Sequence, residues 1–200
     1  MYKEHKNNQL KNFIFTLLLL LAVNLGFGQG MLLQSTSNST IVLTGTSSLH
    51  DWSMKSAADQ CKLQLNEWPK GDSFIINEIK FELPVKQLKS EHNKMDANAQ
   101  KALKSDKYPL IRFSSNSPQY VSKTDAGKMS SVKGLLEIAG VSKEVELNVS
   151  IKNEGNASLH FHFAYDINME EFSVKPPSFM FGAVTTGSYV KAEFELQFNK

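Results

Sequence analysis

The amino-acid sequence predicts an all-β domain of antiparallel strands with one short helix. Apolar and polar residues alternate with a period of two in short runs, and Gly, Asn, Asp, Ser and Pro bound those runs. The composition is that of one folded domain, since the 200 residues are 41% hydrophobic and 21% charged, with 11 Gly and 6 Pro. Disorder, collagen and repeat arrays are therefore excluded.

The chain begins with a segment typical of secretory signal peptides. Residues 1–12 are polar and carry three Lys against one Glu, and residues 13–23 are apolar apart from one Thr. This run is shorter than the roughly 20 residues of a membrane-spanning helix, and small residues follow it. We expect cleavage after Gly28, which leaves residues 29–200 as a periplasmic or secreted domain and residues 1–28 as its signal peptide. An uncleaved N-terminal anchor is the alternative.

Four segments of the mature chain alternate most clearly and are predicted as strands. Their apolar side chains occupy every second position and so share one face of a strand. Repeated strands of this kind indicate an antiparallel sheet with one buried side, which must pack on a second sheet or close upon itself. The four segments are 79–85, 145–151, 159–167 and 189–198, and weaker candidates are 41–46, 49–54, 110–114, 120–123 and 131–139.

One segment has a helical rather than an alternating pattern. Residues 91–105 contain no β-branched residue, and Met95, Ala99, Ala102 and Leu103 fall at helical spacing. The pattern predicts a short amphipathic helix.

A second segment, residues 168–186, is predicted as a long irregular loop. It contains Phe172, Phe179 and Phe181. Loops of this length inside a small domain are commonly functional. Its aromatic content predicts that it covers one end of a barrel.

The charge of the chain argues against one class of partner, and its cysteine content excludes an internal disulfide. The formal net charge is +2, and removal of residues 1–28 takes away three Lys and one Glu, so the mature domain is neutral. A neutral domain lacks the basic excess that binds a phosphate backbone, which argues against nucleic acid. Cys61 is the only cysteine, so no internal disulfide can form.

The sequence offers few candidates for catalysis or metal binding. It contains no nucleophile elbow and no phosphate-binding glycine loop. His160 and His162 are two positions apart on a predicted strand, so both imidazoles share one face and could present two zinc ligands. A third ligand would have to be His50, Asp51, His92 or Asp166. Because the alternation places both histidines on the polar outer face, we expect no enzyme, no metal and no cofactor, and a zinc-dependent hydrolase is the weakest alternative.

Three stretches resemble the YceI-like family. Residues 102–113, ALKSDKYPLIRF, resemble that family's helix end, Tyr/Phe-Pro turn and strand. Residues 136–145, LEIAGVSKEV, look like its hairpin, in which a strand ends at Gly-Val-Thr-Lys, with Ser142 in the usual place of Thr. Residues 44–52, TGTSSLHDW, are similar to a subgroup of the family.

The resemblance implies an exported, lipocalin-like, closed antiparallel β-barrel of about eight strands. It also implies that the apolar interior holds a long isoprenoid chain, such as a polyprenyl compound or a quinone. The family is not known as a catalyst, so the resemblance implies no catalytic residue.

The leading hypothesis is therefore an exported carrier or sequestering protein for isoprenoid lipid. The alternation itself does not distinguish such a cavity from a filled barrel that acts as an interaction module of the cell envelope, and it leaves open whether the chain forms a homodimer. The residues expected to line the cavity are Trp52, Phe81, Leu83, Ile111, Phe113, Leu136, Ile138, Leu147, Phe161, Phe163, Phe194 and Phe198, with Phe172, Phe179 and Phe181 near the mouth.

Overall fold

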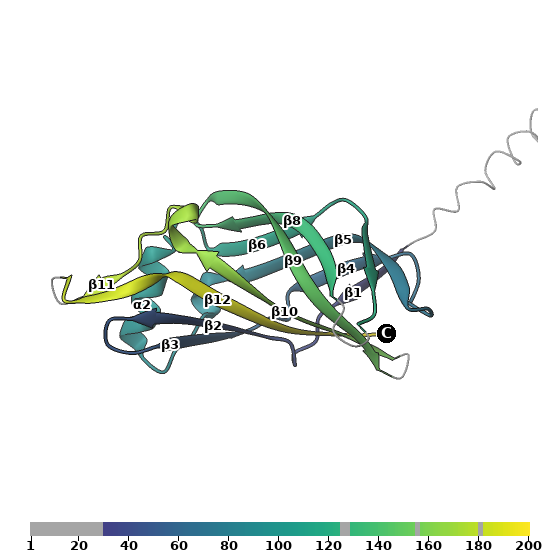
Figure 1. Cartoon of the computed structure of the whole chain (residues 1–200), viewed down its shortest axis with the longest axis horizontal. Coiled ribbons are helices and arrows are strands. Elements are labelled where there is room, and N and C mark those ends of the chain that lie inside the picture. The colour runs from purple at the N-terminus through teal and green to yellow at the C-terminus, as the bar shows by residue number, and fades with distance from the viewer. Residues whose placement is uncertain (1–29, 125–128, 155–156, 180–181) are drawn as a thin grey trace, which may run out of the picture.

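The computed structural model describes residues 30–124, 129–154, 157–179 and 182–200, and these contain twelve strands, most of them in the alternating segments (Figure 1). The strands are β1 (Met31–Gln34), β2 (Thr40–Ser47), β3 (Trp52–Ala57), β4 (Cys61–Leu65), β5 (Ser73–Pro84), β6 (Leu110–Ser115), β7 (Gln119–Ser122), β8 (Ser130–Ile138), β9 (Val141–Glu154), β10 (Ser158–Asn168), β11 (Ser178–Phe179) and β12 (Val184–Asn199). The helices within the same ranges are η1 (Val85–Gln87), α2 (Asn93–Ala102) and η2 (Met169–Phe172), of which η1 and η2 are short 3-10 helices.

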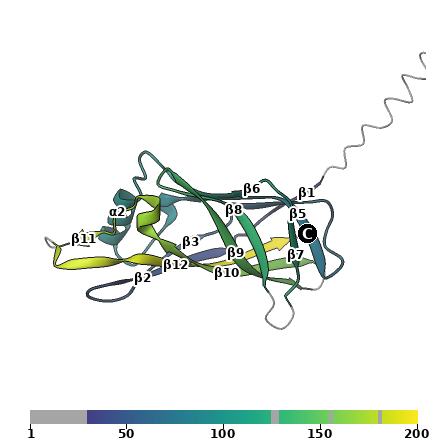
Figure 2. The same ribbon diagram turned by 45° about the horizontal axis from the view of Figure 1, so that its top comes forward.

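The strands belong to one curled antiparallel sheet. Their order is β1-β4-β5-β6-β8-β9-β10-β12-β2-β3, with β7 beside β5 and β11 beside β12. At one end of this order, β3 is joined to the chain after η1 by two backbone hydrogen bonds between Lys55 and Lys89, of 2.7 and 2.8 Å. At the other end, Ser35 follows β1 and bridges to Phe198 on β12. The sheet therefore curls around an interior, and α2 lies at the end of the barrel away from the C-terminus (Figure 2).

The predicted fold class, an antiparallel lipocalin-like barrel with one helix, is confirmed. The described chain has more strands than the eight or so expected, and each end of the sheet is joined to another part of the chain by a single bridge instead of a continuous ladder. The sequence pattern does not predict β1 or β4. Both are short, with four and five residues, and the sequence of β1, MLLQ, lacks apolar–polar alternation.

Several predicted boundaries are wrong; β5, for example, begins at Ser73 and β9 at Val141, before the residues predicted for them. The strand predicted over 49–54 begins only at Trp52, because the Ser47 hydroxyl donates a 2.7 Å hydrogen bond to the His50 carbonyl and holds a turn before it. The loop predicted over 168–186 includes η2, and β12 already begins at Val184.

The core follows the predicted alternation. On β9, for example, Val145, Leu147, Val149 and Ile151 are buried while the residues between them are more exposed. Alternation on strands from both sides of the barrel directs apolar side chains into one shared interior. This interior and the space beneath α2 each contain a cavity.

Candidate ligand-binding cavity

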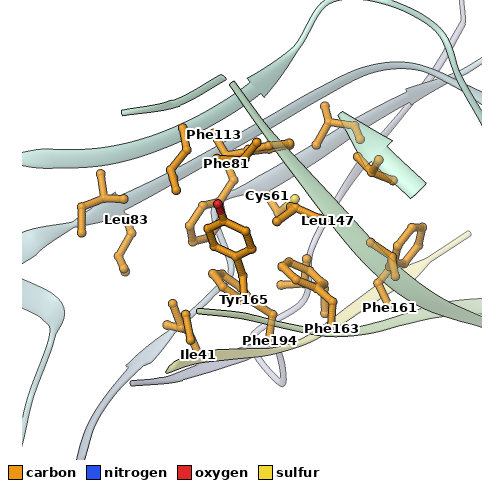
Figure 3. Close-up of a pocket in the computed structure, with 18 of the residues that line it drawn as sticks. Ile41, Cys61, Phe81, Leu83, Phe113, Leu147, Phe161, Phe163, Tyr165 and Phe194 are labelled. Atoms are coloured by element: carbon orange, nitrogen blue, oxygen red, sulfur yellow. The ribbon is translucent and has the colours of Figure 1, made fainter. Parts of the chain in front are cut away.

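The middle of the barrel contains a small apolar cavity, which we call the inner cavity. Its volume is about 110 Å³, and residues such as Ile41, Phe81, Leu147 and Tyr165 line it from opposite walls (Figure 3). Tyr165 and Cys61 are the only lining residues that carry a side-chain heteroatom. Burial raises the pKa of the Cys61 thiol to about 12, so this thiol stays protonated at neutral pH.

Aromatic side chains fill much of the space around the inner cavity. Phe163 and Phe194 stack with their ring centroids 4.5 Å apart, and Phe194 also meets Phe81 edge to face at 5.5 Å. Farther toward the C-terminal end of β12, Phe161 and Phe198 form a second edge-to-face pair at 5.4 Å. Such pairs are favourable geometries for aromatic rings. They explain why the barrel interior is packed tightly and leaves little empty volume.

A larger cavity, which we call the outer chamber, lies beneath α2. Its volume is about 820 Å³. Apolar side chains of α2, β2, β3 and η2 line it, including Met95, Ala99 and Phe172. Polar residues also line it, from the end of β2 and the turn after it, from the chain before α2, from α2 itself and from β12, namely Ser47, His50, Glu91, His92, Asn93, Lys94, Asn98 and Thr186. The outer chamber is thus an apolar space with a partly polar lining.

Four apolar side chains line both cavities, namely Leu43, Ile111, Ile138 and Ile167. They come from β2, β6, β8 and β10 and form the boundary between the outer chamber and the inner cavity. A molecule in the outer chamber therefore meets the same apolar surface that continues into the barrel.

A buried carboxylate fixes α2 over the outer chamber. Asp96 accepts hydrogen bonds from the backbone N–H and the hydroxyl of Ser90, at 2.7 and 2.8 Å, and lies 3.4 Å from the Lys89 ammonium. These contacts hold the pKa of Asp96 below its usual value, the Ser90 hydrogen bonds contributing most. Since Lys89 also pairs with Lys55 on β3, the Asp96 contacts connect the helix to the barrel wall.

Two glycines allow aromatic rings to approach the backbone closely. The Trp52 indole lies so close to Gly45 that a Cβ there would fall 2.3 Å from the ring, and the indole N–H donates a 3.1 Å hydrogen bond to the Thr46 carbonyl. Gly140, which has a positive φ of 82°, accommodates the Tyr108 ring in the same way. The contact between Tyr108 and Gly140 brings together the Tyr-Pro turn and the Gly-Val hairpin, which are two of the stretches that carry the family resemblance.

The structure places thirteen of the fifteen predicted residues on a cavity wall. Ile111 and Ile138 line both cavities, and Trp52 and Phe172 line the outer chamber. Of Phe179 only the backbone, in β11, is described, and Phe181 lies outside the described residues. The residues that line the inner cavity alone are Phe81, Leu83, Phe113, Leu136, Leu147, Phe161, Phe163, Phe194 and Phe198. Whether they bind a ligand stays a prediction.

Sequence reasoning missed much of the outer chamber. The missed residues include Met54, Leu88, Met95, Ala99 and Val174. Met95 and Ala99 were visible as the apolar face of the predicted helix, but the pattern gave no sign of what that face covers. The others stand in different strands and loops that only the folded chain brings together.

The histidine pair lies outside these cavities. His162 is more than half exposed, and its Nδ1 lies 2.6 Å from Glu195 on β12. His160 contacts the Ser158 hydroxyl at 3.2 Å and lies 3.6 Å from Glu154. Among the residues that the structure describes, no three His, Cys, Asp or Glu side chains gather in a way that could hold a metal ion. The third zinc ligand that a hydrolase would need is therefore not brought to this pair.

None of the described helices is both long enough and apolar enough to cross a bilayer.

Comparisons with known proteins define the family of the chain. The structure is similar to BcnA of Burkholderia cenocepacia, with a TM-score of 0.59 at 16% identity over 80% of this chain and 95% of the other. It is also similar to a polyisoprenoid binding domain from Saccharophagus degradans, with a TM-score of 0.59 at 9% identity over 84% and 97%. No curated protein sequence matches the chain. The YceI-like domain family matches residues 33–199, and the chain therefore belongs to this family.

Proposed function

We propose that this protein is an exported carrier or sequestering protein for a long isoprenoid chain, which occupies the outer chamber and extends toward the inner cavity. The observation that carries the proposal is the outer chamber itself, whose apolar surface continues into the barrel across shared side chains. The polyisoprenoid binding domain of similar fold supports this ligand class. Membership of the YceI-like family favours binding over catalysis.

The sizes of the two cavities support a position of the ligand mainly in the outer chamber. At about 110 Å³, the inner cavity is smaller than the cavity of about 150 Å³ that accepts a benzene molecule. The outer chamber, at about 820 Å³, falls within the roughly 300–1,000 Å³ of ordinary ligand pockets. Most of the ligand therefore occupies the outer chamber, and only its apolar end reaches the boundary residues.

Burial of hydrocarbon supplies the affinity. Each buried methylene contributes about 0.8 kcal/mol, and chain ordering offsets part of this gain. Affinity should rise with chain length until the outer chamber is full and then level off. Polar lining residues such as His50, Asn93 and Lys94 suit a ligand whose head group is polar.

Filling the outer chamber tests the proposal. Ala99 lines the chamber from α2, whereas Ala97 on the same helix is exposed and does not line it. Ala99→Phe should lower the affinity for geranylgeraniol by about ten-fold or more, because it displaces several buried methylenes. The matched control Ala97→Phe should bind like the unaltered protein. Equal binding by all three proteins would contradict the proposal.

The natural ligand can be identified directly. Organic extraction of the protein from its native host, followed by mass spectrometry, should recover an isoprenoid lipid. A folded preparation that yields no lipid would favour the filled-barrel interaction module, for which the tightly packed inner cavity is the supporting observation. The Ala99→Phe protein should retain less lipid than the Ala97→Phe protein.

Export is the remaining part of the proposal. Residues 1–28 lie outside the described residues, so the charged and then apolar pattern of the sequence is the support for a signal peptide. The intact mass of the protein from the periplasm or medium should correspond to a chain that begins at Gln29. A chain that keeps Met1 would contradict it.

A further inference from the structure

The outer chamber and the inner cavity are separated at one level of the barrel wall. On β12, Val190 lines only the outer chamber, whereas Ala192, the next inward residue, lines only the inner cavity. Leu43 on β2 is paired with Ala192 and lines both cavities. Ile167 on β10 is paired with Val190 and also lines both. On this wall the boundary therefore falls within one step of two residues along β12.

The change occurs at a similar place on β6 and β8. Ile111 on β6 and Ile138 on β8 line both cavities. The next inward residues on these strands, Phe113 and Leu136, are paired with each other and line only the inner cavity. Figure 3 shows Phe113 across the inner cavity from Phe194 of β12. The four boundary residues thus form an aliphatic layer with members on facing walls, which we call the boundary layer.

Size rather than polarity closes the inner cavity to a ligand. Its lining is hydrocarbon apart from Cys61 and Tyr165, so it offers a prenyl chain the same kind of surface as most of the outer chamber. The stacked rings of Phe163 and Phe194 occupy much of the space, and about 110 Å³ stays open. The space beyond the boundary layer is therefore suited to hydrocarbon in its chemistry but not in its volume.

The volume of the outer chamber gives the chain length that reaches the boundary layer. A cavity of about 150 Å³ holds one benzene molecule, which is roughly 25 Å³ per carbon. At that ratio the outer chamber, with about 820 Å³, holds about 30 carbons, or about six isoprene units. The inner cavity would add about four carbons, and shortening Leu43 to Ala would make room for about three more.

We propose that the boundary layer is a stop that limits the enclosed chain to about six isoprene units, with Leu43 as the residue that separates the two cavities. This inference rests on the proposed function and adds the length of the chain to it. Ala192, the partner of Leu43 across the strand pair, is the smallest residue that lines the inner cavity. Nothing on β12 therefore fills the gap when Leu43 is shortened, and the two cavities should join.

Selection of chain length from a bilayer tests the stop. The protein is incubated with phosphatidylcholine vesicles that carry an equimolar mixture of all-trans prenols, both shorter and longer than the estimate, and is then separated from the vesicles. Mass spectrometry of the extracted prenols gives the retained amount of each length. A chain that is too long for the protein leaves methylenes in water that the bilayer would bury, so retention should fall beyond the stop.

Three variants separate the stop from general effects on the fold. Leu43→Ala opens the stop. Leu33→Ala is the matched control, because it shortens a buried leucine of β1 that lines neither cavity. In Leu43→Ala/Ala192→Leu, which we call the exchanged pair, the leucine moves to the paired strand and closes the gap again. If Leu43→Ala does not fold, Ile111→Ala opens the boundary layer from β6.

The expected result is a shift in the longest prenol retained. The unaltered protein should retain prenols up to about six isoprene units, and retention should fall about ten-fold or more for each further unit, because each methylene left in water disfavours the bound state about four-fold. Leu43→Ala should raise the limit by about one to two units, whereas Leu33→Ala and the exchanged pair should keep it. An unchanged limit in Leu43→Ala, or the same shift in either of the other two variants, would overturn the stop and leave the proposed function intact. Retention of no prenol by the unaltered protein would instead overturn the proposed function, and the stop with it.

Discussion

The inner cavity and the outer chamber differ in how the fold builds them. The inner cavity is enclosed by strands whose inward side chains interdigitate, and it retains about 110 Å³. The outer chamber retains about 820 Å³, because one wall is α2 together with the turns around it. A helix that spans the end of a barrel has no alternating side chains to fill the space below it. The comparison teaches that the room for a ligand lies where strand packing stops.

The largest expected effect concerns stability at the packed end. Phe198 is 0% exposed and packs edge to face on Phe161. Phe198→Ala should lower the free energy of unfolding by about 3–5 kcal/mol, as for other buried phenylalanines. Met95→Ala, in the outer chamber, should lower the free energy of unfolding by only about 1 kcal/mol, because the Met95 side chain is partly exposed.

Urea denaturation of both variants, together with binding of geranylgeraniol, measures this difference. Met95→Ala should weaken binding more, relative to its cost in stability, than Phe198→Ala. If both variants lose the same affinity for a given loss of stability, the packed end and the outer chamber do not differ in their contributions to stability and binding.

The inner cavity and the outer chamber also differ in how well the sequence predicts them. Alternation on Phe161, Phe163, Phe194 and Phe198 places these side chains inside, because one strand suffices to define its own two faces. No such local rule exists for the outer chamber. Its residues come from α2, η2, the β2–β3 turn and β12, and their meeting depends on how distant segments pack.

The next largest effect concerns the attachment of α2. Asp96 is buried and accepts two hydrogen bonds from Ser90, so Asp96→Asn should lower the free energy of unfolding by about 1–3 kcal/mol. It should also weaken ligand binding, because the helix forms one wall of the outer chamber. An unchanged thermal midpoint would show that the Asp96 contacts do not hold the helix.

The same carboxylate predicts a pH dependence. The pKa of Asp96 in the folded protein lies below its value in the unfolded chain, so the carboxylate contributes fully above the usual aspartate pKa of about 4. As the pH falls below that value, the unfolded chain takes up the proton first and the contribution declines, until it is lost at the folded pKa. Thermal midpoints from about pH 7 to about pH 3 should show the unaltered protein approaching Asp96→Asn at the acidic end. A constant difference across this range would contradict the role of the ionised carboxylate.

The smallest expected effect lies on the outer face of β10, where His160 and His162 alternate with the inward Phe161 and Phe163. His162 and Glu195 form an exposed pair at 2.6 Å, with side chains 53% and 64% exposed. Exposed pairs of this kind contribute roughly 0–1 kcal/mol. Replacing both histidines with Ala should therefore change the free energy of unfolding by no more than about 1 kcal/mol and leave the affinity for geranylgeraniol unaltered. A loss of bound zinc or of a hydrolytic activity in this double variant would contradict this expectation, because it would assign chemistry to the outer face. The alternation on β10 thus places histidines, whose replacement should cost little, beside phenylalanines that line the inner cavity.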